Sequence, residues 1–259
     1  YNRFTRGSNP ILNRGISTRL ISTEQYRSSH YWTHKVNGYL ALVGGDEFQT
    51  GCQDLDRSIL ASTNCKMPIV LILPTAAAHQ NPSKAVSNGV EYFSKLGADA
   101  NPLMVLDSEQ ANQESLVSLV ESAQVVYITG GDPKYLIKVL QNSLLLERLI
   151  YLNKHGMSII GSSAGAMVMA AWIRYRSWER GLEIVPDVAV MPHHDEYDPN
   201  QIMLQFTETI PERTTVLGID AQTGCMSRKN GWAVLGPGKV TVYSSNGWKH
   251  YESGRTFSL

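Results

Sequence analysis

A serine between glycines carries the sharpest chemical signal in the sequence. Ser163 lies in the segment 161–165, Gly-Ser-Ser-Ala-Gly, where the apolar run 157–160 ends and a helical pattern begins. A serine on so tight a strand-to-helix turn is held in a strained backbone, with its hydroxyl exposed at the carboxyl edge of a sheet. The pattern therefore predicts a nucleophile elbow. The alternative is a glycine-rich packing turn in which Ser163 caps the helix.

Two backbone amides are candidate donors to an oxyanion. The N–H of Ala164 lies at the start of the helix expected after the nucleophile, where the helix dipole also favours negative charge. Gly131 follows the preceding predicted strand, and neighbouring ends of parallel strands open onto one crevice. We therefore expect both amides to face the same oxygen. Asp132 is expected to cap the helix that Pro133 begins, which uses only its side chain.

A serine hydroxyl needs a base to become a nucleophile at neutral pH. His193 and His194 follow a predicted strand at 187–191, at a strand-to-loop junction where a base is well placed. His193 is the preferred base, and His79, after the second predicted strand, is a second candidate. A structural or solvent-facing histidine pair is the other interpretation.

The spacing of nucleophile and base argues against an ordinary esterase. Ser163 and His193 are 30 positions apart. In esterases and lipases the acid lies between the serine and the histidine, and the triad spreads over several later elements. An esterase acid would have to be Glu179, Glu183 or Asp187.

The elements that must position these residues alternate along the chain. Short strands, apolar along their whole length, alternate with helical patterns, which predicts a parallel sheet covered by helices on both faces. Expected strands are 38–45, 68–76, 102–106, 124–131, 157–163 and 187–191, and expected helices are 54–62, 82–96, 113–122, 133–141, 144–155 and 164–173. After Asn230, Pro-Gly and Asn-Gly turns separate short strands and predict a small antiparallel hairpin appendage. The fold class is therefore α/β with three layers.

The first 36 residues differ in composition from the rest. They hold five arginines and Lys35 against one acid, Glu24, and are rich in serine. Such a composition is typical of an organellar transit segment, and an irregular basic arm is the other interpretation. We predict a basic arm or extension at 1–36 and a single α/β serine hydrolase domain at 37–259. The expected location is the cytoplasm, or an organelle matrix if the arm is a targeting remnant.

Charge and cysteine content exclude several other classes. The 23 basic residues balance 23 acidic ones, so no global field attracts nucleic acid or an anionic membrane. The three cysteines are scattered without paired spacing, which argues against a disulfide framework and a structural zinc site. Apolar runs are far shorter than the roughly 20 residues that cross a bilayer. We therefore expect a protein that binds neither nucleic acid nor membrane.

Several segments, taken in order, resemble the peptidase E and cyanophycinase family of serine hydrolases. They are LVGGDEF, LPTAA, TGGD, GSSAGA, GLEIVPDVAVMPHH, GIDAQTG and WAVLGPGKVTVY. The resemblance implies the fold shared with class I glutamine amidotransferases, which is flavodoxin-like. It also implies Ser163 as nucleophile, His193 as base, and Gly131 with Ala164 as oxyanion donors. No metal or organic cofactor is implied. Related amidotransferases carry cysteine at the elbow, so glutamine hydrolysis is disfavoured.

The sequence differs from this family at the position of the acidic member of the triad. Cyanophycinase-like members carry an acid directly after GID, where this chain has Ala221. Two candidates for the acid of the triad stay open. Glu179 lies shortly after the nucleophile helix, as in peptidase E-like members, and Asp220 lies one position early. Since an orienting acid contributes a large factor to rate, its absence would leave a slow enzyme.

A second departure follows the histidines. Arginines that many members place there are replaced by Asp195, Glu196 and Asp198, which puts a strict preference for aspartyl substrates in doubt. An acidic loop would suit a cationic group near the scissile bond, although a solvated polar loop is an equal alternative. The residues expected to bind substrate are Asp132, His194, Asp195 and Glu196.

The function that these residues predict is a serine-type peptidase acting on a small peptide or isopeptide bond. A catalytically degenerate member that acts as an interaction or structural protein is one alternative, and a small-ester hydrolase is the other. The expected partner is a small peptide substrate, with a homodimer left open.

Overall fold

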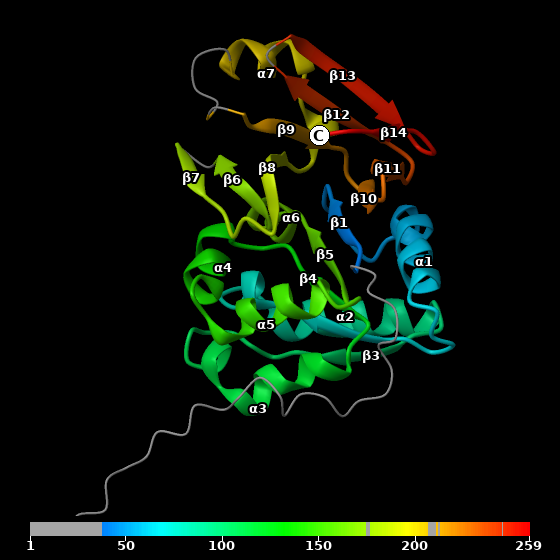
Figure 1. Ribbon diagram of the computed structural model, residues 1–259, viewed down its shortest axis with the longest axis vertical. Coiled ribbons are helices and arrows are strands. Elements are labelled where there is room, and N and C mark those ends of the chain that lie inside the picture. Colours follow the sequence, from blue (N-terminus) through cyan, green and yellow to red (C-terminus); the bar gives the residue numbers. More distant parts are fainter. Residues whose placement is uncertain (1–37, 175–176, 207–210, 212, 245) are drawn as a thin grey trace, which may run out of the picture. The chain divides into compact units, whose positions relative to one another are not determined.

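The computed structural model describes residues 38–174, 177–206, 211, 213–244 and 246–259 (Figure 1). The chain divides into two units, 1–33 and 34–259, and all described residues belong to the second. The arm predicted at 1–36 lies outside the described residues. Within the part described, no helix is long and apolar enough to span a membrane.

An eight-stranded sheet forms the larger part of the fold. Its order is β14-β11-β10-β1-β5-β4-β2-β3, in which β1, β5, β4, β2 and β3 are parallel and the other three strands are antiparallel. The strands are β1 Leu40–Val43, β2 Ile69–Leu73, β3 Asp99–Pro102, β4 Val125–Ile128, β5 Ser158–Ser162, β10 Gly224–Arg228, β11 Gly231–Leu235 and β14 Thr256–Phe257.

Alternate strand residues face two separate helix layers. On β1, Ala41 and Val43 join a core cluster with α1 and α2, whereas Leu42 joins the core cluster on the other face, with α3 to α6. The helices are α1 Gln53–Ser62, α2 Pro82–Lys95, α3 Glu114–Val117, α4 Pro133–Leu140, α5 Leu144–Asn153 and α6 Ala164–Met169. Short 3-10 turns are η1 Thr50–Cys52, η2 Thr75–Ala77, η3 Gln110–Asn112, η4 Ser118–Ser122 and η5 His194–Glu196. The predicted α/β class, with helices on both faces, is confirmed.

A second sheet of six strands has the order β13-β12-β9-β8-β6-β7 (Figure 1). The pairs β6·β8 and β8·β9 are parallel and the remaining pairs are antiparallel. Helix α7 supplies Ile202 to a small core cluster with residues of β8, β9 and β12. The elements are β6 Ala170–Arg174, β7 Trp178–Arg180, β8 Val185–Met191, α7 Pro199–Phe206, β9 Thr215–Ile219, β12 Lys239–Ser244 and β13 Gly247–Glu252. The expected C-terminal appendage therefore consists of strands that extend both sheets.

Three expected elements differ in the structure. The helix predicted at 164–173 ends at Met169, because Ala170 to Arg174 pair with β7 and β8 as strand β6. The strand predicted at 102–106 lies earlier, at Asp99–Pro102, where it pairs with β2 at the edge of the sheet. The helix predicted at 113–122 is one α-turn followed by a 3-10 turn.

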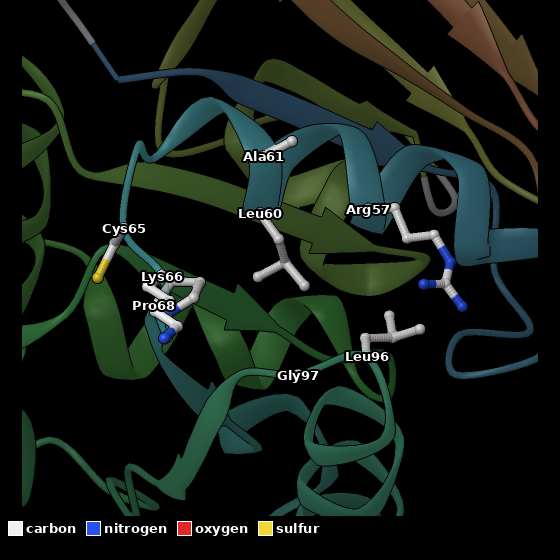
Figure 2. Close-up of a pocket in the computed structure, with 8 residues that line it drawn as sticks. All are labelled: Arg57, Leu60, Ala61, Cys65, Lys66, Pro68, Leu96 and Gly97. Atoms are coloured by element: carbon white, nitrogen blue, oxygen red, sulfur yellow. The ribbon is translucent and has the colours of Figure 1, made fainter.

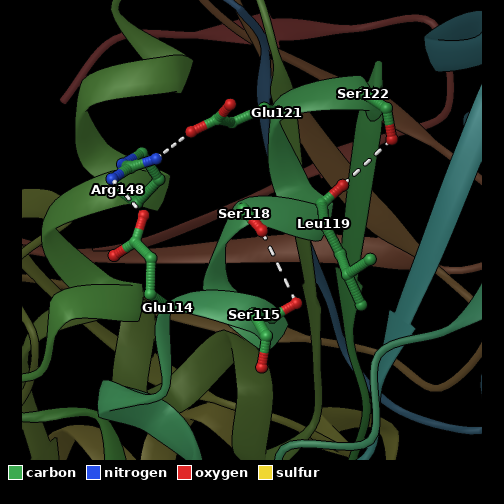
Figure 3. Close-up of polar contacts among 7 residues, drawn as sticks. All are labelled: Glu114, Ser115, Ser118, Leu119, Glu121, Ser122 and Arg148. Carbon is green, nitrogen blue, oxygen red and sulfur yellow. Dashed lines mark hydrogen bonds and ion pairs between the residues drawn. The ribbon is translucent and has the colours of Figure 1, made fainter.

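Ion pairs connect the irregular segment 113–122 to helix α5. Arg148 of α5 forms ion pairs with Glu121 and with Glu114, the latter at 3.4 Å (Figure 3). Ser118 and Ser122 donate hydroxyl hydrogen bonds to carbonyls three residues earlier, at 3.5 and 3.0 Å (Figure 3). Local polar contacts thus hold a segment too short for a full α-helix.

A buried carboxyl group lies on the inner face of α1. Asp56 is fully buried, and its Oδ2 accepts a hydrogen bond of 2.8 Å from the Tyr92 hydroxyl of α2. Burial raises the pKa of Asp56 to about 7, because removal from water disfavours the charged form, and the Tyr92 hydrogen bond only partly offsets this. The native state therefore keeps a proton on Asp56 that the unfolded chain loses near its ordinary pKa of about 4.

We expect this carboxyl group to make stability fall as pH rises from about 4 to about 7, by up to about 4 kcal/mol. Asp56→Asn has no proton to lose, so its stability relative to the wild type should increase across that interval. Urea unfolding of both proteins at several pH values measures the difference. An unchanged difference between wild type and variant at all pH values would contradict the assignment.

Candidate active site

Ser163 lies between the end of β5 and the start of α6, in a strained backbone. Its φ and ψ are 48° and −112°, a region that non-glycine residues rarely occupy. Its N–H donates a hydrogen bond of 3.0 Å to the carbonyl of Val43, at the end of neighbouring β1. Its side chain makes no capping hydrogen bond to α6. The local structure is therefore the strand-turn-helix of a nucleophile elbow.

The glycines of the elbow leave no room for side chains. A Cβ atom on Gly161 would come within 2.6 Å of the Gly165 carbonyl carbon, and one on Gly165 within 2.4 Å of the Ile128 oxygen. Strand β5, the helix α6 and the neighbouring strand β4 are thus in backbone contact around Ser163. This packing requires glycine at both positions.

The loop after β4 lies close to Ser163. A Cβ atom on Gly130 would lie 3.2 Å from the Cβ of Ser163. Gly131 has φ of 142°, and a Cβ there would lie 2.2 Å from the Ala76 oxygen, so only glycine fits without strain. Within the described residues, no acceptor binds the N–H of Gly131 or of Ala164. The role of these two amides as oxyanion donors stays a prediction.

Asp132 caps α4, as expected. Its Oδ1 accepts the N–H groups of Lys134 at 2.9 Å and Tyr135 at 3.1 Å, and its own N–H donates to the Ala76 oxygen. These bonds fix the turn that follows Gly131. A contact of Asp132 with substrate stays a prediction.

His193 follows β8 and is anchored to the same strand end as Ser163. Its N–H donates a hydrogen bond of 2.7 Å to the carbonyl of Gly44. Its ring stands against Gly45, where an added Cβ would come within 2.2 Å of Cε1. Consecutive carbonyls, of Val43 and Gly44, therefore accept the amides of the predicted nucleophile and the predicted base.

The two side chains are not hydrogen-bonded to each other in the described structure. No such bond joins the Ser163 hydroxyl to the His193 ring, although both residues are partly exposed. Catalytic hydrogen bonds in enzymes without substrate are often long and shorten in the complex. The backbone anchors, rather than this bond, define the site here.

The adjacent His194 faces a different environment. It is 2% exposed, its Nε2 lies 2.6 Å from the Tyr243 hydroxyl, and its Nδ1 lies 3.8 Å from Asp220 Oδ1. The other oxygen of Asp220 accepts the Lys239 N–H at 3.0 Å. The structure thus brings Asp220 to His194, not to His193. A contact of the buried His194 with substrate stays a prediction.

The acid of the triad is not identified by the geometry. Glu179, on β7, forms an ion pair of 2.8 Å with Lys134 of α4. No carboxylate of the described residues lies within 4.0 Å of a ring nitrogen of His193. Ala221, which follows Asp220, donates its N–H to Asp195 Oδ1 at 2.7 Å. Glu179 and Asp220 therefore stay predictions as the orienting acid.

The other sequence candidates lie elsewhere. The alternative base His79 is exposed, with its ring edge to face with Tyr135 of α4 at a centroid distance of 4.2 Å. Glu183 and Asp187, the esterase acids, are exposed residues with positive φ before and within β8. Nothing among the described residues joins them to His193.

A cavity of about 430 Å³ opens beside His193. It is mostly apolar, with one basic and one acidic side chain. Its lining residues are Pro133, Met167, Arg174, Val190, Met191, Pro192, His193, Glu196 and Tyr197. Of the acidic loop, only Glu196 lines it, since Asp195 is bonded to Ala221 and Asp198 Oδ1 accepts the Asn200 N–H.

A second cavity, of about 310 Å³, lies where the ends of α1 and α2 approach each other (Figure 2). Arg57, Leu60 and Ala61 come from α1, and Leu96 and Gly97 follow α2 (Figure 2). It contains none of the residues predicted to act in catalysis.

Sequence reasoning missed one polar residue at the site. Glu47, in the loop after β1, accepts hydrogen bonds from the N–H of Gly130 at 2.9 Å and from the Ser162 hydroxyl at 2.7 Å. Its place in the segment LVGGDEF, which carries the family resemblance, was the available signal.

The model of Peptidase family S51 matches residues 40–232. The chain belongs to peptidase family S51. It is a serine-type peptidase, and the family resemblance drawn from its segments is confirmed.

Known members resemble this S51 chain over most of its length. A cyanophycinase of Geminocystis herdmanii is 30% identical over 229 residues, 83% of each chain. A cyanophycinase of Nostoc sp. is 24% identical over 216 residues, which are 78% of this chain and 72% of the relative. The crystal structure of a peptidase from an acI-B1 actinobacterium has a TM-score of 0.78 and 28% identity, covering 87% of this chain and 98% of that one.

A putative peptidase E of Listeria monocytogenes has a TM-score of 0.58 and 16% identity, covering 78% of this chain and all of that one. This similarity shows the fold alone.

We expect Gly161→Ala to destabilise the S51 chain by roughly 3 kcal/mol or more, because the new methyl meets backbone atoms of Gly165 that cannot rotate away. Urea unfolding measures the loss. Gly254→Ala is the control without a close contact: nothing lies within 4 Å of its added methyl, and its positive φ of 80° accounts for an expected loss of roughly 1 kcal/mol. Equal losses in the two variants would contradict the tight contact at the elbow.

Proposed function

We propose that this S51 peptidase cleaves a small peptide or isopeptide bond with Ser163 as nucleophile and His193 as base. The observation that carries the proposal is the pair of consecutive carbonyls at the end of β1, of Val43 and of Gly44 directly after it, which accept the amides of both residues. The strained backbone of Ser163 and the contact of Gly130 with its Cβ support the same reading.

The proposed reaction has two halves. The Ser163 oxygen attacks the scissile carbonyl carbon while His193 takes the hydroxyl proton. The resulting oxyanion is stabilised by the N–H groups of Gly131 and Ala164, which bind no acceptor among the described residues. His193 then returns the proton to the leaving amine, and the C–N bond breaks. Water, deprotonated by His193, hydrolyses the acyl-enzyme and restores the serine.

The rate should be low if no carboxylate orients the base. In serine peptidases of another fold, replacement of the orienting acid lowers kcat by about four orders of magnitude but leaves catalysis above the rate in water. The described residues place Asp220 on His194 and Glu179 on Lys134. A slow enzyme is therefore consistent with the site as it stands.

The cavity beside His193 supports a substrate with a cationic group. Glu196 is the one member of the acidic loop that lines it, and Arg174 also lines it. One acid and one base in an otherwise apolar cavity match a peptide that carries both an amine or basic side chain and a carboxylate. The similarity to cyanophycinases supports peptide-bond hydrolysis and leaves the residue preference to experiment.

A fluorophosphonate probe tests the nucleophile and the base. We expect the wild type to be labelled, Ser163→Ala to be unlabelled, and His193→Gln to be labelled about a thousandfold more slowly, because serine and histidine act as a unit. His79→Gln is the matched control and should be labelled at the wild-type rate, since His79 packs on Tyr135 away from the elbow.

Other outcomes separate the alternatives. A folded wild type that takes no label indicates a degenerate member with an interaction role. Turnover of nitrophenyl esters without cleavage of any dipeptide indicates a small-ester hydrolase. Slow labelling of His79→Gln together with normal labelling of His193→Gln would refute the assigned base.

A second prediction concerns Glu196, the acidic side chain that lines the cavity. Glu196→Gln should lower kcat/KM for lysyl and arginyl dipeptides by about fivefold relative to aspartyl dipeptides, a modest factor because the side chain is exposed. Competition between paired substrates measures this ratio. Asp198→Asn is the control, since Asp198 belongs to the same loop but does not line the cavity. Equal ratios in the wild type and Glu196→Gln would remove the loop from substrate selection.

A further inference from the structure

The carboxylate of Glu47 bridges the two strand ends that carry the proposed site. Its Oε1 accepts the N–H of Gly130 at 2.9 Å, and its Oε2 accepts the hydroxyl of Ser162 at 2.7 Å. Each donor immediately precedes a residue of the proposed machinery, Gly131 after β4 and Ser163 after β5. A single side chain from the loop after β1 is therefore bonded to both.

The loop that carries Glu47 is itself rigidly held. Asp46 and Phe48, on either side, have φ values of 52° and 66°, which only a well-determined surrounding maintains. The Phe48 ring packs on those of Tyr92 and Tyr127, with centroids 5.7 and 4.9 Å away. The Cys52 thiol contacts the Asp46 carbonyl at 3.5 Å. The two hydrogen bonds of the Glu47 carboxylate therefore connect the site to a loop whose own position is fixed.

Loss of the Glu47 carboxylate would disturb the groups packed around it. A Cβ atom added to Gly130 would lie 3.3 Å from Glu47 Oε1 and 3.2 Å from the Ser163 Cβ, so little space is left between the loop, the carboxylate and the elbow. Ser162 is fully buried, and loss of its acceptor would leave a buried hydroxyl unpaired. Removal of the carboxylate is therefore expected to shift the loop or the elbow, and not simply to leave them in place.

Resting on the proposed function, we infer that Glu47 is a positioning residue that sets the separation between the oxyanion loop and the nucleophile elbow. It acts on formation of the acyl-enzyme through Gly131 and Ser163, which follow its two hydrogen-bond donors. A misplacement of about 1 Å between nucleophile and oxyanion donors lowers rates by about a hundredfold in enzymes. The contribution is to the maximum rate of the covalent step and not to binding.

Three substitutions separate length from charge. Glu47→Ala removes both hydrogen bonds. Glu47→Asp keeps the charge but is one methylene shorter, about 1.5 Å, and cannot reach both donors. Glu47→Gln keeps the length, because its amide oxygen can accept from Gly130 while its NH₂ donates to the Ser162 oxygen, which can accept as well as donate.

The test is the rate of fluorophosphonate labelling of the full chain, resolved into the half-saturating probe concentration and the maximum rate, with thermal unfolding measured alongside. We expect Glu47→Ala and Glu47→Asp to lower the maximum rate about tenfold or more with an unchanged half-saturating concentration. Glu47→Gln should stay within about threefold of the wild type. Glu91→Ala is the control, a carboxylate on α2 that pairs only with Lys95 of the same helix.

Wild-type labelling rates in both Glu47→Ala and Glu47→Asp would overturn the inference, even if their unfolding temperatures fall, since that is the result of a purely structural role. A Glu47→Gln rate as low as that of Glu47→Ala would also overturn it. If Glu47→Ala does not fold, Ser162→Ala removes one of the two bonds, and an unchanged rate there contradicts the proposal. A wild type that is not labelled at Ser163 instead refutes the proposed function, and the role of Glu47 falls with it.

Discussion

The carbonyls of Val43 and Gly44 accept the main-chain amides of Ser163 and His193, and the site depends on these two hydrogen bonds. Main-chain bonds of this kind do not rely on the identity of the side chains at positions 43 and 44, so they fix geometry without taking part in chemistry. Glycine is nevertheless required at position 44, because a Cβ there would lie 2.2 Å from the main-chain carbonyl oxygen of Asp220. The residue that accepts the His193 amide is thus itself packed against the end of β9.

Both residues of the pair are held in unfavourable backbone conformations. Ser163 has φ of 48° and His193 has φ of 50°. Such residues persist only where the surroundings over-determine them, and here each has its own carbonyl anchor on β1. The reversal of the chain at His193 also sends its neighbour His194 into the buried cluster with Tyr243 and Asp220. Two consecutive imidazoles therefore have different partners.

The parts of the site that the sequence predicted are those encoded locally. The elbow at Ser163 needs only a strand, a turn and a helix in succession, and the loop at Gly131 needs only the end of the preceding strand. Strand β6 was predicted as helix, because its pairing partners on β7 and β8 decide its conformation. Glu47 was missed for a similar reason, since its hydrogen-bond partners are 83 and 115 positions away. Which carboxylate, if any, orients His193 depends on side-chain direction, which periodicity does not encode.

The proposed nucleophile, Ser163, follows β5 of the eight-stranded sheet, whereas the proposed base, His193, follows β8 of the six-stranded sheet. The alignment of these two residues therefore depends on how the two sheets pack together, and not on either sheet alone. One core cluster contains residues of both sheets, among them Leu42 of β1 and Val190 of β8, so burial of apolar side chains between the sheets maintains this alignment. Catalytic competence should consequently be lost on heating as soon as the packing between the sheets loosens, even while each sheet keeps its own hydrogen bonds.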